Sequence, residues 1–297
     1  MLIDDFLKYL QEEKEMSLNT IEAYKKDVIA FQNYLNEEGI NDPTMATNTA
    51  IIAYLVELKN EGKAKSTVNR KLASIRSFYR YLMKNGLIDQ NPTEDIKSPK
   101  IARKKIQYLS IPEVNKLLEM PDDSVKGKRD RAMLEVLYAT GIRVSEIIEM
   151  RKKDVNLELG FVTCTGNHGK ARIVPMGRPA IRATRDYMEN SRKILMKNQD
   201  SEAPDSYLFV NYNGESFTRQ GFWKVMKSYG EKAGLSEKLT PQILRNSFAM
   251  HLVHNGIDIK SLQELMGHED ISATQVYFGN TKNRIKGVYD RTHPRAK

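Results

Sequence analysis

Most of the information in this 297-residue chain lies in three short segments: ATGIRVSE at 139–146, LRNSFA at 244–249 and LMGH at 265–268. The histidine of the third segment lies 23 residues after the arginine of the second, and a tyrosine follows nine residues later. A lone arginine or tyrosine would carry little information, but an ordered set with these separations is specific. The set consists of Arg143, Arg245, His268 and Tyr277.

This set resembles the signature of the tyrosine recombinase (phage integrase) family, and within it the Xer-type, XerD-like group. The resemblance covers nearly the whole chain and includes TVNRKLASIRSF at 67–78, TRQGFW at 218–223 and HPRA at 293–296. It implies a mainly α fold with a small β-hairpin sheet, divided into an N-terminal four-helix, SAM-like core-binding domain and a C-terminal catalytic domain. It also implies a site-specific recombinase that cuts and rejoins DNA through a 3′-phosphotyrosyl intermediate, as in chromosome-dimer resolution or mobile-element integration.

The chemistry of the set agrees with this resemblance. Cutting a phosphodiester without a metal ion requires stabilising a pentacoordinate phosphate, and guanidinium groups suit this because they stay charged and offer bidentate donors. A tyrosine hydroxyl, with an ordinary pKa of about 10, is a poor nucleophile until a cationic site stabilises the phenolate. We therefore expect Arg143 and Arg245 to clamp the phosphate and Tyr277 to attack it. We expect His268 to hydrogen-bond the phosphate or assist proton movement, and no metal or other cofactor to be needed.

The chain departs from the family pattern at three positions. Active members usually carry a lysine on the hairpin as the general acid toward the 5′-oxygen, where this chain has Asn167, and histidines where it has Gln242 and Asn246. One hypothesis is that Lys170 or His168, both on the hairpin, donates the leaving-group proton. The rival is a catalytically weakened paralogue that acts as a site-specific DNA-binding partner or regulator. The catalytic residues that we expect are Arg143, Lys170, Gln242, Arg245, His268 and Tyr277.

The formal net charge of +9 is confined to one block of the chain. Residues 59–105 hold 13 basic and four acidic side chains, which accounts for the whole excess. A local basic block on an otherwise neutral protein is typical of contact with a polyanion, most often nucleic acid. The plainer interpretation is a solvated helix face followed by a basic linker. The DNA-binding residues that we expect are Lys65, Arg70, Lys71, Arg76, Arg80, Arg219 and Gln220.

The spacing of apolar residues predicts four helices in an N-terminal domain over 1–88. Prolines and charges predict a basic linker over 89–107. We expect the catalytic domain over 108–297, with further helices and one β-hairpin whose strands lie near 161–164 and 172–175.

Composition excludes several classes of protein. With 40% hydrophobic and 29% charged residues the chain can bury a core, and it has no apolar run of roughly 18 residues that would span a membrane. We expect no signal peptide, and the single Cys164 excludes an internal disulfide framework and cysteine-clustered zinc. We expect a cytoplasmic, nucleoid-associated protein whose partner is double-stranded DNA. The family implies a homo- or hetero-tetramer on two DNA sites, with a second recombinase as a candidate partner.

Overall fold

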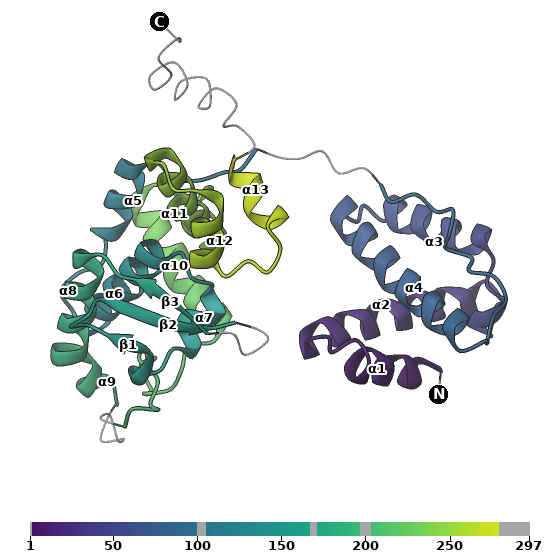
Figure 1. Ribbon diagram of the computed structural model, residues 1–297, viewed down its shortest axis with the longest axis horizontal. Coiled ribbons are helices and arrows are strands. Elements are labelled where there is room, and N and C mark those ends of the chain that lie inside the picture. Colours follow the sequence, from purple (N-terminus) through teal and green to yellow (C-terminus); the bar gives the residue numbers. More distant parts are fainter. Residues whose placement is uncertain (1, 100–104, 167–170, 197–202, 279–297) are drawn as a thin grey trace, which may run out of the picture. The chain divides into compact units, whose positions relative to one another are not determined.

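The chain divides into two compact units, Met1–Lys104 and Lys105–Lys297. Figure 1 shows the computed structural model coloured along the sequence, with the first unit in purple and blue and the second running from teal to yellow. Helices dominate both units, and the second unit also holds one small sheet, as the sequence predicts. The structure describes residues 2–99, 105–166, 171–196 and 203–278.

Within residues 2–99, the first unit contains the predicted four α-helices. Their bounds are α1 Leu2–Glu12, α2 Leu18–Glu37, α3 Asn48–Asn60 and α4 Lys65–Lys84, with a 3-10 turn at Pro43–Met45. Side chains fix where two of these helices begin, because the N–H groups of a first turn lack partners within the helix. Ser17 accepts from the N–H of Thr20 at the start of α2, and Thr47 accepts from that of Ala50 at the start of α3.

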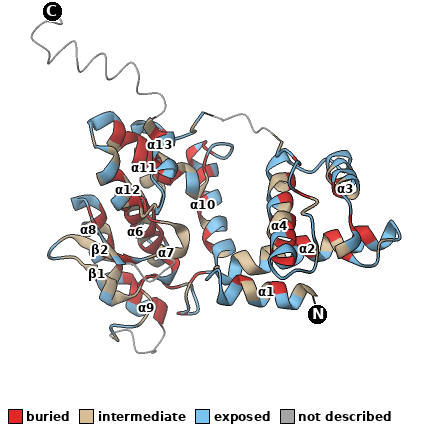
Figure 2. Cartoon of the chain, turned by 45° about the vertical axis from the view of Figure 1, so that its right-hand side comes forward, coloured by how far each residue is buried: buried red, intermediate tan, exposed pale blue. Residues whose placement is uncertain are grey.

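The apolar stripe of α4 forms the centre of the first unit. Phe78 packs edge-on against Phe6 of α1, with ring centroids 5.3 Å apart. Tyr79 is fully buried, and its hydroxyl donates to the carbonyl oxygen of Pro43 at 2.9 Å, so burial leaves no polar atom of the ring unsatisfied. In Figure 2, α2 and α4 each carry buried residues on part of their surface and exposed or intermediate residues on the rest.

The segment after α4 packs back onto the first unit. Asn48 donates from Nδ2 to the carbonyl oxygen of Pro92 at 3.0 Å, and Arg76 donates to that of Ile96. The side chain of Ile96 is buried in the same core. The part of the segment 89–107 that lies before residue 100 is therefore held by the helices of the first unit.

The second unit contains nine α-helices among its described residues. Their bounds are α5 Ile111–Leu118, α6 Val125–Thr140, α7 Val144–Glu149, α8 Arg178–Tyr187, α9 Lys193–Met196, α10 Arg219–Ala233, α11 Pro241–Asn255, α12 Ile259–Met266 and α13 Ser272–Phe278. A 3-10 turn precedes the sheet at Lys152–Asp154, and a π-helical turn at Met188–Arg192 joins α8 to α9. Ser110 and Glu113 close a capping box at the start of α5.

The sheet has three antiparallel strands, β1 Val155–Asn156, β2 Phe161–Thr165 and β3 Ala171–Pro175, in this order. Strands β2 and β3 form the predicted hairpin, with the buried side chains of Val162 and Val174 opposite each other. The sequence does not predict β1, because two residues are too few to show an alternating pattern.

Close packing between α6 and α11 sets the position of the polar residues that follow. Helix α6 ends at Gly141, which has a left-handed φ of 59°. A Cβ at this position would lie 2.1 Å from a ring carbon of Phe248 on α11. Glycine therefore allows the end of α6 to approach α11 closely enough for the carbonyl oxygen of Gly141 to meet Arg245.

Candidate active site

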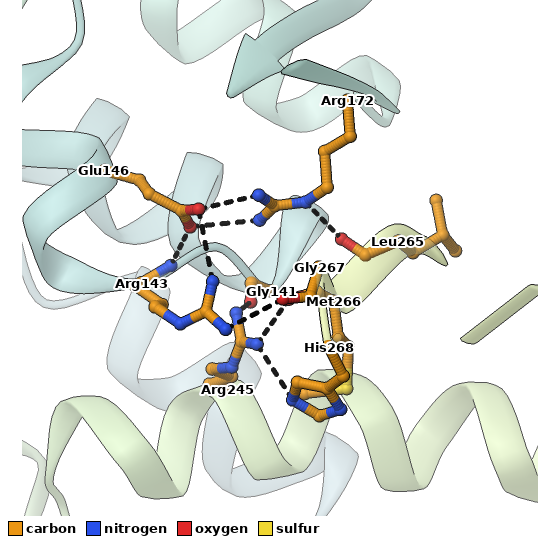
Figure 3. Close-up of polar contacts among 9 residues, drawn as sticks. All are labelled: Gly141, Arg143, Glu146, Arg172, Arg245, Leu265, Met266, Gly267 and His268. Carbon is orange, nitrogen blue, oxygen red and sulfur yellow. Dashed lines mark hydrogen bonds and ion pairs between the residues drawn. The ribbon is translucent and has the colours of Figure 1, made fainter. Parts of the chain in front are cut away.

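Arg143 stands directly before α7 and is held from two sides. Its backbone N–H donates to Oε2 of Glu146 at 2.6 Å, and its Nη1 lies 3.4 Å from Oε1 of the same carboxylate. Its Nη2 donates to the carbonyl oxygen of Gly267 at 2.9 Å (Figure 3). The side chain is nonetheless 40% exposed, so the fixed guanidinium can still meet a ligand from solvent.

Arg245 lies on α11 and is only 6% exposed. It donates to the carbonyl oxygen of Gly141, to that of Met266 at 2.6 Å and to Nε2 of His268 at 3.2 Å (Figure 3). These partners are dipoles and a ring nitrogen, not a carboxylate. Burial, with a contribution from Arg143, lowers the pKa of Arg245 to about 10, so the group is charged at neutral pH. A buried cation that is satisfied only by dipoles favours the entry of an anion.

His268 is held as a neutral ring. A guanidinium can only donate, so its bond to Nε2 of His268 requires a lone pair there, and we assign the proton to Nδ1, which donates to Oγ1 of Thr274 at 2.8 Å. Burial and the charges of Arg245 and Arg143 lower the pKa of His268 to about 4. At neutral pH this residue is therefore a hydrogen-bond acceptor or a base and not an acid.

Tyr277 lies on α13 and is 5% exposed. Its ring is parallel to that of His268, with the centroids 6.4 Å apart. Its hydroxyl donates to Oδ1 of Asn246 at 3.0 Å. Burial raises the pKa of the phenol and the charge of Arg245 opposes this effect, so the hydroxyl is protonated at neutral pH. The structure thus brings Tyr277 together with the two arginines and the histidine that the sequence singled out.

The remaining predicted catalytic residues fall into two groups. Gln242 is exposed on α11, one turn before Asn246, and donates from Nε2 to Oδ1 of that residue at 2.9 Å. The two positions at which α11 departs from the family pattern are therefore bonded to each other, and one of them, Asn246, is also bonded to Tyr277. Asn167, His168 and Lys170 lie outside the described residues.

Two further residues of the site were missed by the sequence analysis. Arg172 on β3 forms a bidentate pair with Glu146, at 2.6 and 3.0 Å, and donates from Nε to the carbonyl oxygen of Leu265 at 2.9 Å (Figure 3). Burial alone would raise the pKa of Glu146, but the hydrogen bonds and charges of Arg172 and Arg143 outweigh it and hold this pKa below its ordinary value. This ion pair joins the hairpin to Arg143 and to the end of α12.

Gly267 makes room for this junction. It ends α12 with a left-handed φ of 60°, and a Cβ there would lie 2.8 Å from the guanidinium carbon of Arg172. Two sequence signals could have revealed the junction. Glu146 stands three residues after Arg143, where a carboxylate caps a helix start, and Arg172 is a charged residue within a predicted strand.

The predicted DNA-binding residues of α4 occupy different surroundings. Lys65 and Arg80 are exposed. Arg70 pairs with the buried carboxylate of Asp27, and Lys71 lies 3.8 Å from the same carboxylate. Arg76 donates to Oγ of Ser98 at 2.8 Å and to the carbonyl oxygen of Ile96. Of these five cations, Arg70, Lys71 and Arg76 therefore have partners within the first unit, whereas Lys65 and Arg80 show no such partner among the described residues.

The other two predicted DNA-binding residues, Arg219 and Gln220, are the first residues of α10. Thr218 caps this helix by accepting from the N–H of Gly221 at 3.0 Å, and both predicted residues are exposed. A helix start presents N–H groups and the positive end of the helix dipole, which suits contact with a phosphate.

The described part of the chain lacks two kinds of feature. No helix there is long and apolar enough to cross a membrane. Within the same residues, no group of three or more His, Cys, Asp or Glu side chains could hold a metal ion. His251, which stands three residues before His254, instead contacts the Tyr138 hydroxyl through Nδ1 at 2.9 Å.

Comparison with known proteins places this chain in a family. The model of the phage integrase family matches residues 107–284, and that of the phage integrase N-terminal SAM-like domain matches residues 3–86. The chain is 41% identical over 297 residues to the tyrosine recombinase XerD of Listeria innocua, covering 99% of both chains. It is 41% identical over 296 residues to that of Staphylococcus epidermidis, again covering 99% of both.

Solved structures agree with this placement at the level of the fold. The structure of the Tn1549 transposon integrase in complex with transposon right end DNA has a TM-score of 0.77 at 18% identity, covering 98% of this chain and 99% of that one. XerH recombinase bound to its difH substrate has a TM-score of 0.76 at 21% identity, covering 97% and 84%. The relatives match nearly the whole length of the chain, and the range matched by the phage integrase model spans the positions of both arginines, the histidine and the tyrosine. This chain therefore belongs to the phage integrase family, among the tyrosine recombinases of the Xer type.

Proposed function

We propose that this chain is a site-specific DNA recombinase, which cuts a DNA strand by attack of Tyr277 on a backbone phosphate and rejoins strands through a 3′-phosphotyrosyl link. The observation that carries the proposal is the guanidinium of Arg245. It is buried and charged, and its partners among the described residues are carbonyl oxygens and His268, whose ring lies parallel to that of Tyr277. The alignment with XerD recombinases along the full chain supports the same activity.

In the proposed step, a bond forms between Oη of Tyr277 and phosphorus while the bond from phosphorus to the 5′-oxygen breaks. The phenol loses one proton and the 5′-oxygen gains one, so the step is balanced without an external energy source. Arg143 and Arg245 stabilise the charge that develops on the non-bridging oxygens, because each guanidinium offers directed donors that stay charged. Attack of a 5′-hydroxyl on the phosphotyrosyl link reverses the step and reseals a strand.

The neutral state of His268 assigns it a role as a base. Its Nε2 lone pair is occupied by Arg245 in the DNA-free chain. A phosphate that accepts the Nη2 donor of Arg245 would free that lone pair beside the phenol. The negative charge of the bound phosphate offsets the arginine charges that lower the pKa of His268, so the neutral ring becomes a stronger base and takes the proton of Tyr277.

For the leaving group, the proposal is that Lys170 or His168 donates the proton to the 5′-oxygen. A double variant, Lys170→Ala with His168→Ala, should slow cleavage of a nicked suicide substrate about 10²-fold or more. A substrate with a 5′-bridging sulfur should restore the rate, because a thiolate leaves without a proton. An unchanged rate with the ordinary oxygen substrate would contradict the assignment.

We also propose that cleavage is slow, because Asn167 and Gln242 replace residues that carry titratable protons in the family pattern. An amide donates hydrogen bonds but does not relay a proton at neutral pH. Asn167→Lys should therefore increase the rate of cleavage of a nicked substrate. No increase would remove this explanation.

The proposed partner is double-stranded DNA, gripped by the exposed cations of α4 and by the start of α10. Following the family, four protomers would assemble on two DNA duplexes, and a second recombinase is a candidate member of that tetramer. Mass photometry of the chain with a duplex site should show a species of four protomers and two duplexes. Only monomers on DNA at saturating concentration would contradict this assembly for the chain acting alone.

A covalent-adduct assay tests the function as a whole. The chain is mixed with nicked candidate sites, and SDS gels report protein that remains attached to DNA. The wild type should form an SDS-stable adduct that is absent from Tyr277→Phe, while both bind the DNA with similar affinity. Tight, site-selective binding without an adduct on any substrate would contradict the enzymatic function.

A further inference from the structure

The amide of Asn246 makes three hydrogen bonds around the nucleophile. Its Oδ1 accepts from the hydroxyl of Tyr277 at 3.0 Å and from Nε2 of Gln242 at 2.9 Å. Its Nδ2 donates to the carbonyl oxygen of Gln107 at 3.0 Å. The bond to this carbonyl fixes which end of the amide faces the tyrosine, and the two bonds to Oδ1 use both of its lone pairs.

The surroundings of Asn246 hold it firmly in place. It directly follows Arg245 on α11, and the next residue, Ser247, accepts from the N–H of Leu109 at 2.8 Å. The segment 107–109 is therefore hydrogen-bonded to two successive residues of α11. Ile106, just before it, packs against the same apolar cluster that contains Tyr277.

We propose that Asn246 is a positioning residue for the nucleophile: its Oδ1 holds the Tyr277 hydroxyl in a single place from which a phosphate beside Arg245 can be attacked. This inference rests on the recombinase function proposed above. Asn246 cannot act as the base, because an amide oxygen accepts a hydrogen bond without taking the proton. Its contribution is geometric, and a displacement of the reacting atom by about 1 Å can cost about 10²-fold in rate.

The charges around the phenol make this contact measurable. Arg245 on α11 is the charged group that acts on Tyr277, and His268 contributes a neutral ring from the segment after α12. Asn246 adds an acceptor, which favours the protonated phenol over the phenolate. Removing that acceptor should therefore change the acidity of Tyr277 as well as its position.

The experiment places 3-fluorotyrosine at position 277 and follows its titration by fluorine NMR in the DNA-free chain, with and without Asn246→Ala. Water that enters the space left by the amide can donate as well as accept, so the midpoint should fall by about one pH unit. Adduct formation at saturating nicked DNA should nonetheless slow by about 10- to 100-fold, with the Kd for DNA unchanged within about twofold. A lower pKa of Tyr277 together with slower adduct formation is the result that lost positioning of the hydroxyl predicts.

Asn255→Ala is the matched control, because it makes the same substitution at the exposed end of the same helix. Neither the midpoint nor the rate should change in it. Asn246→Asp is the second variant, and it keeps an acceptor beside the phenol while adding negative charge. Its midpoint should rise, opposite to that of Asn246→Ala.

Three results would overturn the proposal. One is an unchanged midpoint and rate in Asn246→Ala, another is faster cleavage in that variant, and the third is a lower midpoint in Asn246→Asp. If the wild type forms no adduct on any DNA, the recombinase function fails, and the fluorine titration then decides by itself whether Asn246 holds the hydroxyl.

Discussion

Two buried charges, one in each unit, are satisfied in opposite ways. The carboxylate of Asp27 is 2% exposed and is paired with Arg70 and Lys71, with Oγ of Ser74 donating to it at 2.8 Å. Arg245 is nearly as buried, but its partners are carbonyl oxygens and His268. A buried charge that is paired in place makes the fold depend on its partners, whereas a buried cation held by dipoles remains available to an incoming anion.

The largest effect is expected when Arg245, the buried charge held by dipoles, is altered. Arg245→Lys keeps the charge and removes the fork, so adduct formation on nicked DNA should fall by about 10³-fold while DNA affinity changes by less than about threefold. The measurement is the single-turnover adduct rate at saturating DNA. The matched control is Arg185→Lys on the exposed side of α8, which should leave the rate unchanged. A loss of less than tenfold in Arg245→Lys would contradict the role assigned to this guanidinium.

Altering Asp27, the buried charge that is paired with cations, should affect stability instead. Asp27→Asn removes the shared partner of two cations, and the free energy of unfolding of the first unit should fall by about 2 kcal/mol. We expect a smaller loss of stability than for a fully buried ion pair, because Arg70 is half-exposed and can turn toward solvent. Urea unfolding, followed separately for each unit by hydrogen exchange, measures the loss. If the adduct rate at saturating DNA fell while stability did not, the contrast between the two charges would be wrong.

A smaller effect is expected from pH. The folded-state pKa of His268 lies near 4, below its ordinary 6.5, so the unfolded chain binds the extra proton more readily between these values. Stability should therefore decrease as the pH falls from about 6.5 toward 4, by about 1 kcal/mol from this residue because the ring stays partly in contact with solvent. His268→Gln should lose that component of the pH dependence. An identical pH profile in the variant would contradict the neutral assignment.

The smallest effect concerns the exposed cations of α4. Lys65→Gln and Arg80→Gln should each weaken DNA binding a few-fold and reduce the slope of log Kd against log salt by about 0.9. Lys71→Gln should change the slope less and the stability of the first unit more, because its ammonium serves Asp27. Equal slopes for all three variants would contradict the prediction that the paired Lys71 contributes less to DNA binding than the exposed Lys65 and Arg80.

The sequence predicts the helical modules, the hairpin and the four central catalytic side chains because each leaves a local signal. Apolar spacing marks the helices, and the separations of Arg245, His268 and Tyr277 mark the site. It does not predict the partners of those groups, because they come from distant segments. Asp27 lies outside the basic block 59–105. Counting charges within this block therefore could not show that two of the block's cations, Arg70 and Lys71, are already paired.

The same limit applies inside the catalytic unit. The ion pair of Glu146 with Arg172 joins residues 26 positions apart, and the bond of Asn246 to Gln107 joins residues 139 positions apart. At the level of sequence Asn246 is only a departure from a family pattern. Packing of α13 against α11 turns it into the group that receives the Tyr277 hydroxyl.

The most direct test of the account is to locate the covalent link. The adduct formed on nicked DNA is digested with nuclease and trypsin, and mass spectrometry searches for a peptide that carries a nucleotide. We expect the nucleotide on Tyr277, within the tryptic peptide 261–282, joined through its 3′-phosphate. A nucleotide on any other residue, or a link through a 5′-phosphate, would contradict it.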